Sequence, residues 1–163
     1  IFNPMAQMPL AVAIAALIQD HKILLIKRVK GSYVGFWGLP GGKIEKDEHV
    51  SDAAVREIFE EAGIKSTFVS HLGFVSEHLK EDNAVHQHFL LHLCELSPHS
   101  TTIVEGKEGA LQWFSLADLP ALKDKIIPSD YLMIEKMVLQ REKTYYNCVV
   151  EKRGEEHVMQ RFD

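Results

Sequence analysis

The sequence predicts a mixed α/β (α+β) fold in which several β-strands and two α-helices follow one another in mixed order. Apolar residues alternate or run continuously through short segments bounded by turn residues, which is typical of strands. Two other stretches place apolar residues at helical spacing between helix start and stop residues. With 163 residues and no linker or internal repeat, the chain is expected to form a single domain over residues 1–163.

The N-terminal part is predicted to hold two strands, at residues 10–19 and 22–28, joined by a short polar turn. Residues 29–38 are spaced by glycines and are predicted to form a loop. Residues 39–42 (Leu-Pro-Gly-Gly) follow as a backbone turn, in which glycine permits either a positive φ or the close approach of a ligand.

A first helix is expected after this turn. Ser51 or Asp52 is predicted to cap it, and it should end near Ala62 with Gly63 just beyond. The glutamates of this helix are expected on the side opposite the buried residues. The residues expected to be buried are Ala54, Val55, Ile58 and Phe59.

Two further strands are predicted at residues 65–78 and 86–95, with residues 79–84 as a polar connection between them. Another strand is expected at residues 110–115, followed at residues 116–120 by a short helical turn or a loop.

A second long helix is predicted to begin near Pro128, with Tyr131, Ile134 and Val138 as its apolar stripe. The domain core is expected at about residues 8–142. Beyond it, residues 145–162 are expected to form a C-terminal hairpin around Arg153 and Gly154, packed on the domain or on a second subunit. Either a monomer or a homodimer is compatible with this pattern.

Composition argues against two classes of partner, long nucleic acids and membranes. The net charge is −5 and no Lys/Arg cluster is present, so a long nucleic acid is not an expected partner. No apolar stretch is long enough for a membrane span, and no signal peptide is recognised, so no membrane partner is expected. Cys94 and Cys148 lie far apart without metal or redox spacing. They are expected to be buried reduced thiols, which predicts a cytoplasmic protein.

Three acidic side chains are the strongest functional signal. Glu57, Glu60 and Glu61 have i, i+3, i+4 spacing, which on a helix places them on one face. Crowded like charges destabilise a helix unless a cation lies among them. Hard oxygen ligands suit Mg²⁺ or Mn²⁺, and Mg²⁺ usually completes its shell with the phosphates of a substrate. The spacing therefore predicts a divalent cation site for a small anionic ligand.

The surrounding residues follow the pattern Gly-x5-Glu-x7-Arg-Glu-U-x-Glu-Glu-x-Gly-U, with U a bulky aliphatic residue, which resembles the Nudix box. The matched residues are Gly42, Glu48, Arg56, Glu57, Ile58, Glu60, Glu61, Gly63 and Ile64. The resemblance implies the Nudix fold, a mixed sheet that curls toward a barrel and is sandwiched between helices. It also implies hydrolysis of a phosphoanhydride, which needs a positioned water, charge neutralisation and a base.

By resemblance, Glu57, Glu60 and Glu61 bind the divalent ion, with the carbonyl of Gly41 as a backbone ligand. Glu57 or Glu60 is alternatively the base that takes the proton from water, and the sequence does not separate these roles. Arg56 is included among the catalytic residues because it is expected to orient a box carboxylate.

A further acidic ligand is common in the family on the loop before a later strand. Residues 106–109, followed by residues 113–116, resemble that segment. Glu108 is therefore the candidate for an additional metal ligand or base, and Glu105 is the nearby alternative. Glu48 is expected to act as a second-sphere group.

Markers that distinguish ADP-ribose, dinucleoside polyphosphate and NADH hydrolases are absent after the box, which favours the MutT-like class. Such enzymes remove pyrophosphate from nucleoside triphosphates, including oxidised ones. Arg28 is a candidate phosphate or sugar contact, and Asp130 is a candidate contact to the base. Trp37, together with Phe36, is a candidate for stacking on the base. The other substrate-binding candidates are Gly42 and Lys43 in the segment that precedes the helix.

Three alternatives stay open. The chain is alternatively a nucleoside diphosphate-sugar hydrolase of the ADP-ribose type. It is alternatively a nucleotide-binding Nudix domain without turnover, although no box glutamate has been lost. An RNA-end hydrolase is disfavoured by the net charge. In each case the expected ligand is a small nucleotide or a nucleotide-like end.

Overall fold

The computed structural model describes residues 8–104 and 109–163. Its first two strands, β1 (Leu10–Gln19) and β2 (Lys22–Lys27), form the predicted N-terminal hairpin. The turn between them consists of Asp20 and His21, with φ of 50° and 62°. Two consecutive left-handed residues make a tight turn whose twist matches that of the flanking strands. This expectation from the sequence is confirmed.

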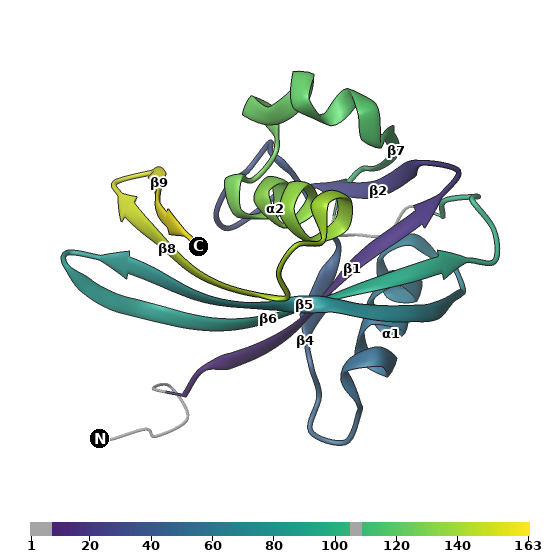
Figure 1. Cartoon of the computed structure of the whole chain (residues 1–163), viewed down its shortest axis with the longest axis horizontal. Coiled ribbons are helices and arrows are strands. Elements are labelled where there is room, and N and C mark those ends of the chain that lie inside the picture. The colour runs from purple at the N-terminus through teal and green to yellow at the C-terminus, as the bar shows by residue number, and fades with distance from the viewer. Residues whose placement is uncertain (1–7, 105–108) are drawn as a thin grey trace.

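The strands of the described residues form a nine-stranded mixed sheet with the main order β3-β2-β1-β6-β5-β8-β9. In addition, β4 pairs with β1 and β7 pairs with β2. Figure 1 shows the long strands β5 and β6 crossing the molecule, with the hairpin β8–β9 at the end away from β2. The remaining strands are β3 (Trp37–Gly38), β4 (Gly41–Lys43), β5 (Ser66–Glu81), β6 (Ala84–Pro98), β7 (Leu111–Ser115), β8 (Tyr145–Arg153) and β9 (Glu156–Phe162).

Strand β1 lies at the centre of the fold because it pairs with three strands, antiparallel with β2 and β4 and parallel with β6. Its alternate side chains enter two separate apolar cores. Ile14 and Ala16 belong to one core, whereas Ala13 and Leu17 belong to the other. A strand buried on both faces has a continuous apolar sequence, which explains the unbroken run that the sequence shows here.

Helices cover both faces of the sheet. The helix α1 (Val50–Ala62) packs on the core that contains Ala13 and Leu17. The other core is covered by α2 (Pro128–Met133) and by the π-helical segment η3 (Ile134–Gln140) that continues it. Figure 1 shows α1 and α2 on opposite sides of β1. The mixed sheet sandwiched between helices is therefore confirmed.

The second helix and the segment before it also agree with the sequence. The 3₁₀ segment η2 (Leu116–Lys125) occupies the place of the expected helical turn and extends beyond it. Tyr131, Ile134 and Val138 are all buried, as the apolar stripe predicted.

No helix among the described residues is both long and apolar enough to cross a membrane.

Two details of α1 differ from the prediction. The helix begins at Val50, with His49 as a cap residue that makes no side-chain hydrogen bond, so Ser51 and Asp52 lie inside the first turn. Phe59 is 51% exposed, whereas Glu61 is only 4% exposed. The prediction that all the glutamates face away from the buried side is therefore wrong for Glu61.

Helical geometry explains the burial of Glu61. It follows Ile58 by three residues, and Ile58 follows Ala54 by four, so these three residues lie on one stripe. Hydrophobicity alone assigned Phe59 to the core, but Phe59 lies outside that stripe. The C-terminus of α1 matches the expectation, since Gly63 is left-handed at φ 66° and its N–H donates to the carbonyl of Phe59.

The predicted polar connection at residues 79–84 is wrong. Strand β5 continues to Glu81, β6 begins at Ala84, and only Asp82 and Asn83 form the turn, with φ of 52° and 62°. Asp and Asn tolerate the left-handed region, so two residues suffice to reverse the chain. The polar sequence at residues 79–84 predicted a loop. Strand ends that extend beyond the core, however, pair through their backbones and do not need apolar side chains.

The C-terminal hairpin is confirmed. Strands β8 and β9 are antiparallel around Gly154, which has φ 64°. The hairpin packs on its own domain, because β8 pairs in parallel with β5 over Phe74–Glu81. Cys94 and Cys148 are both buried and free, as expected for reduced thiols.

Candidate active site

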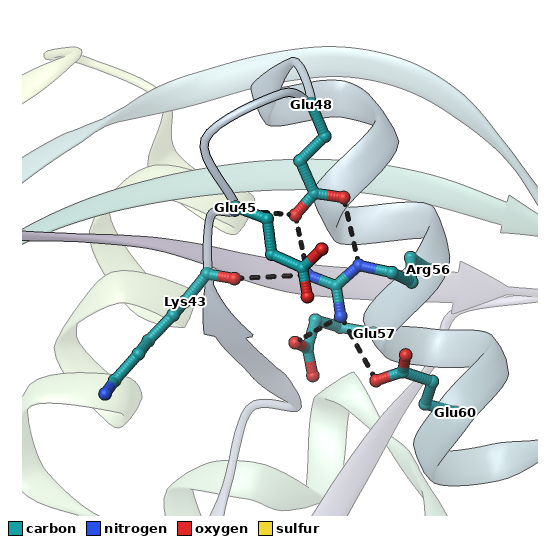
Figure 2. A network of polar contacts seen from close by, with 6 residues as sticks. All are labelled: Lys43, Glu45, Glu48, Arg56, Glu57 and Glu60. Atoms are coloured by element: carbon teal, nitrogen blue, oxygen red, sulfur yellow. Dashed lines mark hydrogen bonds and ion pairs between the residues drawn. The ribbon is translucent and has the colours of Figure 1, made fainter.

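The guanidinium of Arg56 joins three box carboxylates (Figure 2). Its Nε and Nη2 donate to the two oxygens of Glu48, at 2.9 and 2.6 Å. Its Nη1 donates to Glu57 at 2.9 Å and to Glu60 at 3.1 Å, and Nη2 also donates to the backbone carbonyl of Lys43 at 3.1 Å. One side chain thus connects α1 with β4 and with the loop between them.

This network keeps Glu48 ionised. Hydrogen bonds from Arg56, and secondly from the backbone N–H of Glu45, lower the pKa of Glu48 to about 2. Glu48 and Glu57 in turn raise the pKa of Arg56. Ion pairs this close to solvent contribute little to stability, so we attribute to Arg56 the orientation of the carboxylates. The sequence predicted the same role for Arg56, and it stays a prediction.

The three box glutamates on α1 lie at different depths. Glu61 is 4% exposed, whereas the side chains of Glu57 and Glu60 are 13% and 56% exposed. Glu57 and Glu60 share one nitrogen of Arg56, so their carboxylates are neighbours. Glu61 instead faces the backbone of β4 across a small pocket. The helix therefore presents a graded set of oxygens from the protein interior to the solvent.

Two glycines of β4 make this arrangement possible. A Cβ on Gly42 would lie 2.5 Å from the carboxyl carbon of Glu57. A Cβ on Gly41 would overlap the carbonyl oxygen of Ala13 in the neighbouring strand. Neither glycine has a positive φ. The sequence left open whether glycine is needed here for a positive φ or for close approach. The structure therefore supports close approach.

The small pocket beside Glu61 has a volume of about 160 Å³. Gly41 and Glu61 line it, and so do the cationic residues Arg28 and Lys30. Carboxylate and carbonyl oxygens suit a hard cation, and the two basic side chains suit phosphate oxygens. The pocket thus combines the two kinds of group that a metal-bound polyphosphate requires.

A larger cavity of about 300 Å³ adjoins the small pocket, because Arg28, Leu39 and Gly41 line both. Its apolar floor comes from strands of the sheet and includes Ile14 and Leu91. The polar side chains that line it are Arg28, Ser32, Tyr33, Glu77, Ser129, Asp130 and His157. An apolar cavity with a few convergent polar groups is the usual form of a small-ligand site.

Asp130 is fixed at the N-terminus of α2 and touches the turn before β4. Its Oδ2 accepts a hydrogen bond from the N–H of Leu39 at 2.8 Å. The pKa of Asp130 is raised to about 7, mainly by burial and also by the nearby Glu77, whereas the bond from Leu39 acts in the opposite direction. A carboxyl with this pKa can accept a hydrogen bond or donate one near neutral pH.

Glu77 is the second carboxyl of the cavity. Burial raises its pKa, although hydrogen bonds from Cys148 and Ser129 oppose that shift. The thiol of Cys148 donates to Glu77 Oε1 at 3.6 Å. Glu77 also raises the pKa of Asp130. Two buried carboxyls whose ionisation is costly gain from ligand groups that donate hydrogen bonds to their ionised forms.

We expect the Asp130→Asn variant to lose part of the pH dependence of folding stability. The pKa of Asp130 is raised on folding, so the folded protein binds the proton more tightly than the unfolded chain. Between about pH 4 and pH 7 the contribution of Asp130 to stability should therefore fall as pH rises in the wild type, and it should be absent from the variant. Urea unfolding at several pH values measures this. Parallel profiles for the two proteins would contradict the assignment.

The structure brings together most residues predicted for the site. Arg56, Glu57 and Glu60 form one hydrogen-bonded group. Gly41, Glu61 and Arg28 surround the small pocket, and Arg28 and Asp130 line the larger cavity. The functional roles of all these residues stay predictions.

Three predicted residues are placed differently or not at all. Trp37 packs edge-to-face on Phe114, with ring centroids 4.9 Å apart, and lines neither pocket. Lys43 contributes its carbonyl to Arg56, while its ammonium points away from the guanidinium (Figure 2). Glu108, like its alternative Glu105, lies outside the described residues.

Sequence reasoning did not identify Glu77, Tyr33, Ser129 or His157 as cavity residues. For Glu77 the sequence did contain an indication of a buried position. Val75, Glu77 and Leu79 lie on the same face of β5, and Val75 and Leu79 belong to the apolar core. A charged residue on the apolar face of a strand indicates a buried polar site.

The box residues fit a divalent cation by their chemistry. Carboxylates and a backbone carbonyl are hard oxygen donors, and the carboxylate of Glu57 needs a glycine at position 42 to lie where it does. Within residues 8–104 and 109–163, no three His, Cys, Asp or Glu side chains gather into a complete ligand set. Mg²⁺ does not require one, because it usually keeps waters and substrate phosphates as ligands.

Known proteins resemble this chain in sequence. The human nucleoside diphosphate-linked moiety X motif 6 is 36% identical over 66% of the chain and 34% of its own length. The chain thus spans about a third of that relative. The CTP pyrophosphohydrolase of Escherichia coli is 33% identical, over 78% of the chain and 91% of the relative. The ADP-ribose pyrophosphatase of Methanocaldococcus jannaschii is 36% identical, over 75% and 73%.

The fold has solved counterparts. A MutT NUDIX hydrolase from Burkholderia pseudomallei superposes with a TM-score of 0.67 at 32% identity, covering 79% of this chain and 98% of that protein. The family model of the NUDIX domain matches residues 8–137, which include the whole box and most of the cavity. The chain therefore belongs to the NUDIX domain family.

Proposed function

We propose that this protein is a Mg²⁺-dependent pyrophosphohydrolase that cleaves a nucleoside triphosphate to the monophosphate and pyrophosphate. One observation carries the proposal: the small pocket beside the box and the larger cavity share Arg28, Leu39 and Gly41. A ligand with a base in the larger cavity would therefore have its phosphates beside the box glutamates.

Different residues of the chain bind the phosphates, hold the base, position the glutamates and accept a proton. Arg28 and Lys30 attract and orient the phosphates, and the cavity around Asp130 holds the base. Arg56 keeps Glu57 and Glu60 in position. We assign to Glu60, the most exposed of the box glutamates, the acceptance of the proton from an attacking water, with Glu57 as the alternative.

Mg²⁺, or Mn²⁺ in its place, would be held by Glu57, Glu61 and the carbonyl of Gly41. Glu60 would be a further ligand if Glu57 is the base in its place. When bound there, it supplies charge neutralisation on the phosphates and an activated water. Glu108 remains a proposed additional ligand or base. Two buried thiols suit a reducing compartment, and we propose a cytoplasmic location on that ground.

Relatives support a nucleotide substrate. The Escherichia coli relative named as a CTP pyrophosphohydrolase has nearly its full length covered by this chain. The paired carboxyls Glu77 and Asp130 suit a base that presents amino or ring N–H donors. Nucleotides oxidised on the base belong to the same substrate class.

Phosphate release across a panel tests the proposal. With Mg²⁺ present, we expect at least one nucleoside triphosphate, from CTP, ATP, GTP, UTP and oxidised dGTP, to give monophosphate and pyrophosphate. Turnover should stop when EDTA removes the ion. Preference for a nucleotide sugar over every triphosphate would reject the substrate class, and binding without release would indicate a non-catalytic domain.

ADP-ribose-type hydrolysis is the second candidate. The Methanocaldococcus jannaschii relative named as an ADP-ribose pyrophosphatase supports it, as does a groove of about 840 Å³ beside the cavity. That groove runs between residues 31–36 and the C-terminal hairpin, and it offers room for a second sugar. Including ADP-ribose in the panel ranks the two candidates directly.

A further inference from the structure

The C-terminal hairpin forms part of the wall of the larger cavity, although it lies beyond residue 137, where the match to the family model ends. Strand β8 pairs with β5 so that Cys148 lies opposite Glu77 and Val150 opposite Leu79. Val150 lines the cavity, and the thiol of Cys148 donates to Glu77. The hairpin is therefore bonded to a polar group of the ligand site.

One ring contact lies where the cavity meets the outer groove. Tyr33 in the loop before β3 lies against His157 of β9, with ring centroids 4.3 Å apart and planes tilted by 34°. Both residues, together with Ser32, line the cavity and also the groove of about 840 Å³. The two rings thus lie at the boundary between the inner site and the groove.

The imidazole of His157 has an unused acceptor. Its Nε2 is buried and has no hydrogen-bond partner among the described residues. The ring also bonds to the backbone of Glu155, an interaction that raises its pKa, so Nδ1 is the nitrogen that donates there. Burial and the charge of Lys152 lower the pKa, which keeps the ring neutral and leaves Nε2 as an acceptor.

An orphaned buried nitrogen is unfavourable. The bond from Nδ1 to the backbone of Glu155 accounts for one ring nitrogen of His157, but it does not account for Nε2. A nearby ligand that carries N–H groups would satisfy the nitrogen, and the adjacent carboxyls Glu77 and Asp130 call for the same kind of ligand.

We propose that the C-terminal hairpin is a specificity element of the ligand site, in which His157 Nε2 accepts a hydrogen bond from an N–H of the bound base. The proposal rests on the proposed function for the nature of the ligand. It adds a residue from outside the matched family domain that affects affinity and takes no part in bond cleavage.

Calorimetric titration with AMP, CMP, GMP and UMP in the absence of divalent ions tests the proposal independently of turnover. We expect His157→Phe to weaken the tightest of the four about tenfold. Its melting temperature should stay close to that of the wild type, because the loss of the orphaned nitrogen offsets the loss of the Nδ1 bond to Glu155. His157→Ala should weaken binding at least as much.

Arg161→Ala is the matched control, since Arg161 lies on the same strand, is 52% exposed and pairs with Asp163. Its affinities should stay within twofold of the wild type. Unchanged affinity of His157→Phe for all four monophosphates would overturn the proposal, as would failure of the wild type to bind any of them. Binding that follows the expected pattern without phosphate release from any triphosphate would sustain it and reject the proposed enzymatic function alone.

Discussion

Replacing Glu61 with Gln should lower pyrophosphate release by roughly 10³-fold or more while leaving the protein folded. Glu61 is only 4% exposed and faces the small pocket together with Gly41. The substitution keeps the shape of the side chain but removes the negative charge that would hold the cation. Charge stabilisation by a metal contributes several kcal/mol to such reactions, and each 1.36 kcal/mol corresponds to about a tenfold change in rate.

Two measurements separate this effect from unfolding. Thermal unfolding should give a Glu61→Gln midpoint no lower than that of the wild type, because the variant buries an amide in place of a charge. Titration with Mn²⁺, followed by its paramagnetic resonance signal, should show weakened ion binding. Glu142→Gln is the matched control, since Glu142 is exposed and lies outside the site. Full activity in Glu61→Gln would reject the proposed metal site.

The same titration distinguishes the roles of the exposed glutamate. If Glu60 is the base, Glu60→Gln should lose turnover but keep its affinity for Mn²⁺. If Glu60 is a metal ligand, both quantities should fall together. Its side-chain exposure of 56% makes a large effect on stability unexpected in either case.

The box was predictable because it is local. All of its residues lie between Gly42 and Ile64, most of them on one helix or next to it, so spacing along the chain determines spacing in space. The hairpin at Asp20 and the helix end at Gly63 were predictable for the same reason. In each case a short segment contains both the signal and the structure.

The ligand cavity was only partly predictable because tertiary pairing assembles it. Glu77, Asp130 and His157 are far apart in sequence and meet because β8 pairs with β5 in parallel while α2 packs over the same core. Local patterns do not specify which strands pair across such distances. Trp37 illustrates the converse, since an aromatic residue beside a glycine turn suggested a ligand contact, whereas the ring packs on Phe114.

Gly41→Ala should destabilise the fold by about 2 kcal/mol or more, the range expected when atoms are forced into a well-packed interior. A Cβ at this position would overlap the carbonyl oxygen of Ala13 and lie 3.0 Å from the Cα of Ile14. Both atoms belong to the backbone of β1, which is held by three neighbouring strands and cannot move without breaking their pairing. Urea unfolding monitored by circular dichroism would measure the loss.

Gly35→Ala separates steric overlap from backbone strain. Gly35 has φ 87°, but a Cβ there would meet no atom within 4 Å. That variant should lose only the penalty of a left-handed conformation, about 1 kcal/mol. Gly41 has no positive φ, so its penalty must come from the overlap with β1. If Gly35→Ala proved the more damaging change, the close approach of β4 to β1 would not be the reason for glycine at position 41. We expect Gly41→Ala to be the more destabilising of the two variants. The close packing of β4 on β1, which leaves no room for a side chain at position 41, also brings the backbone of Gly41 to the pocket that Glu61 lines.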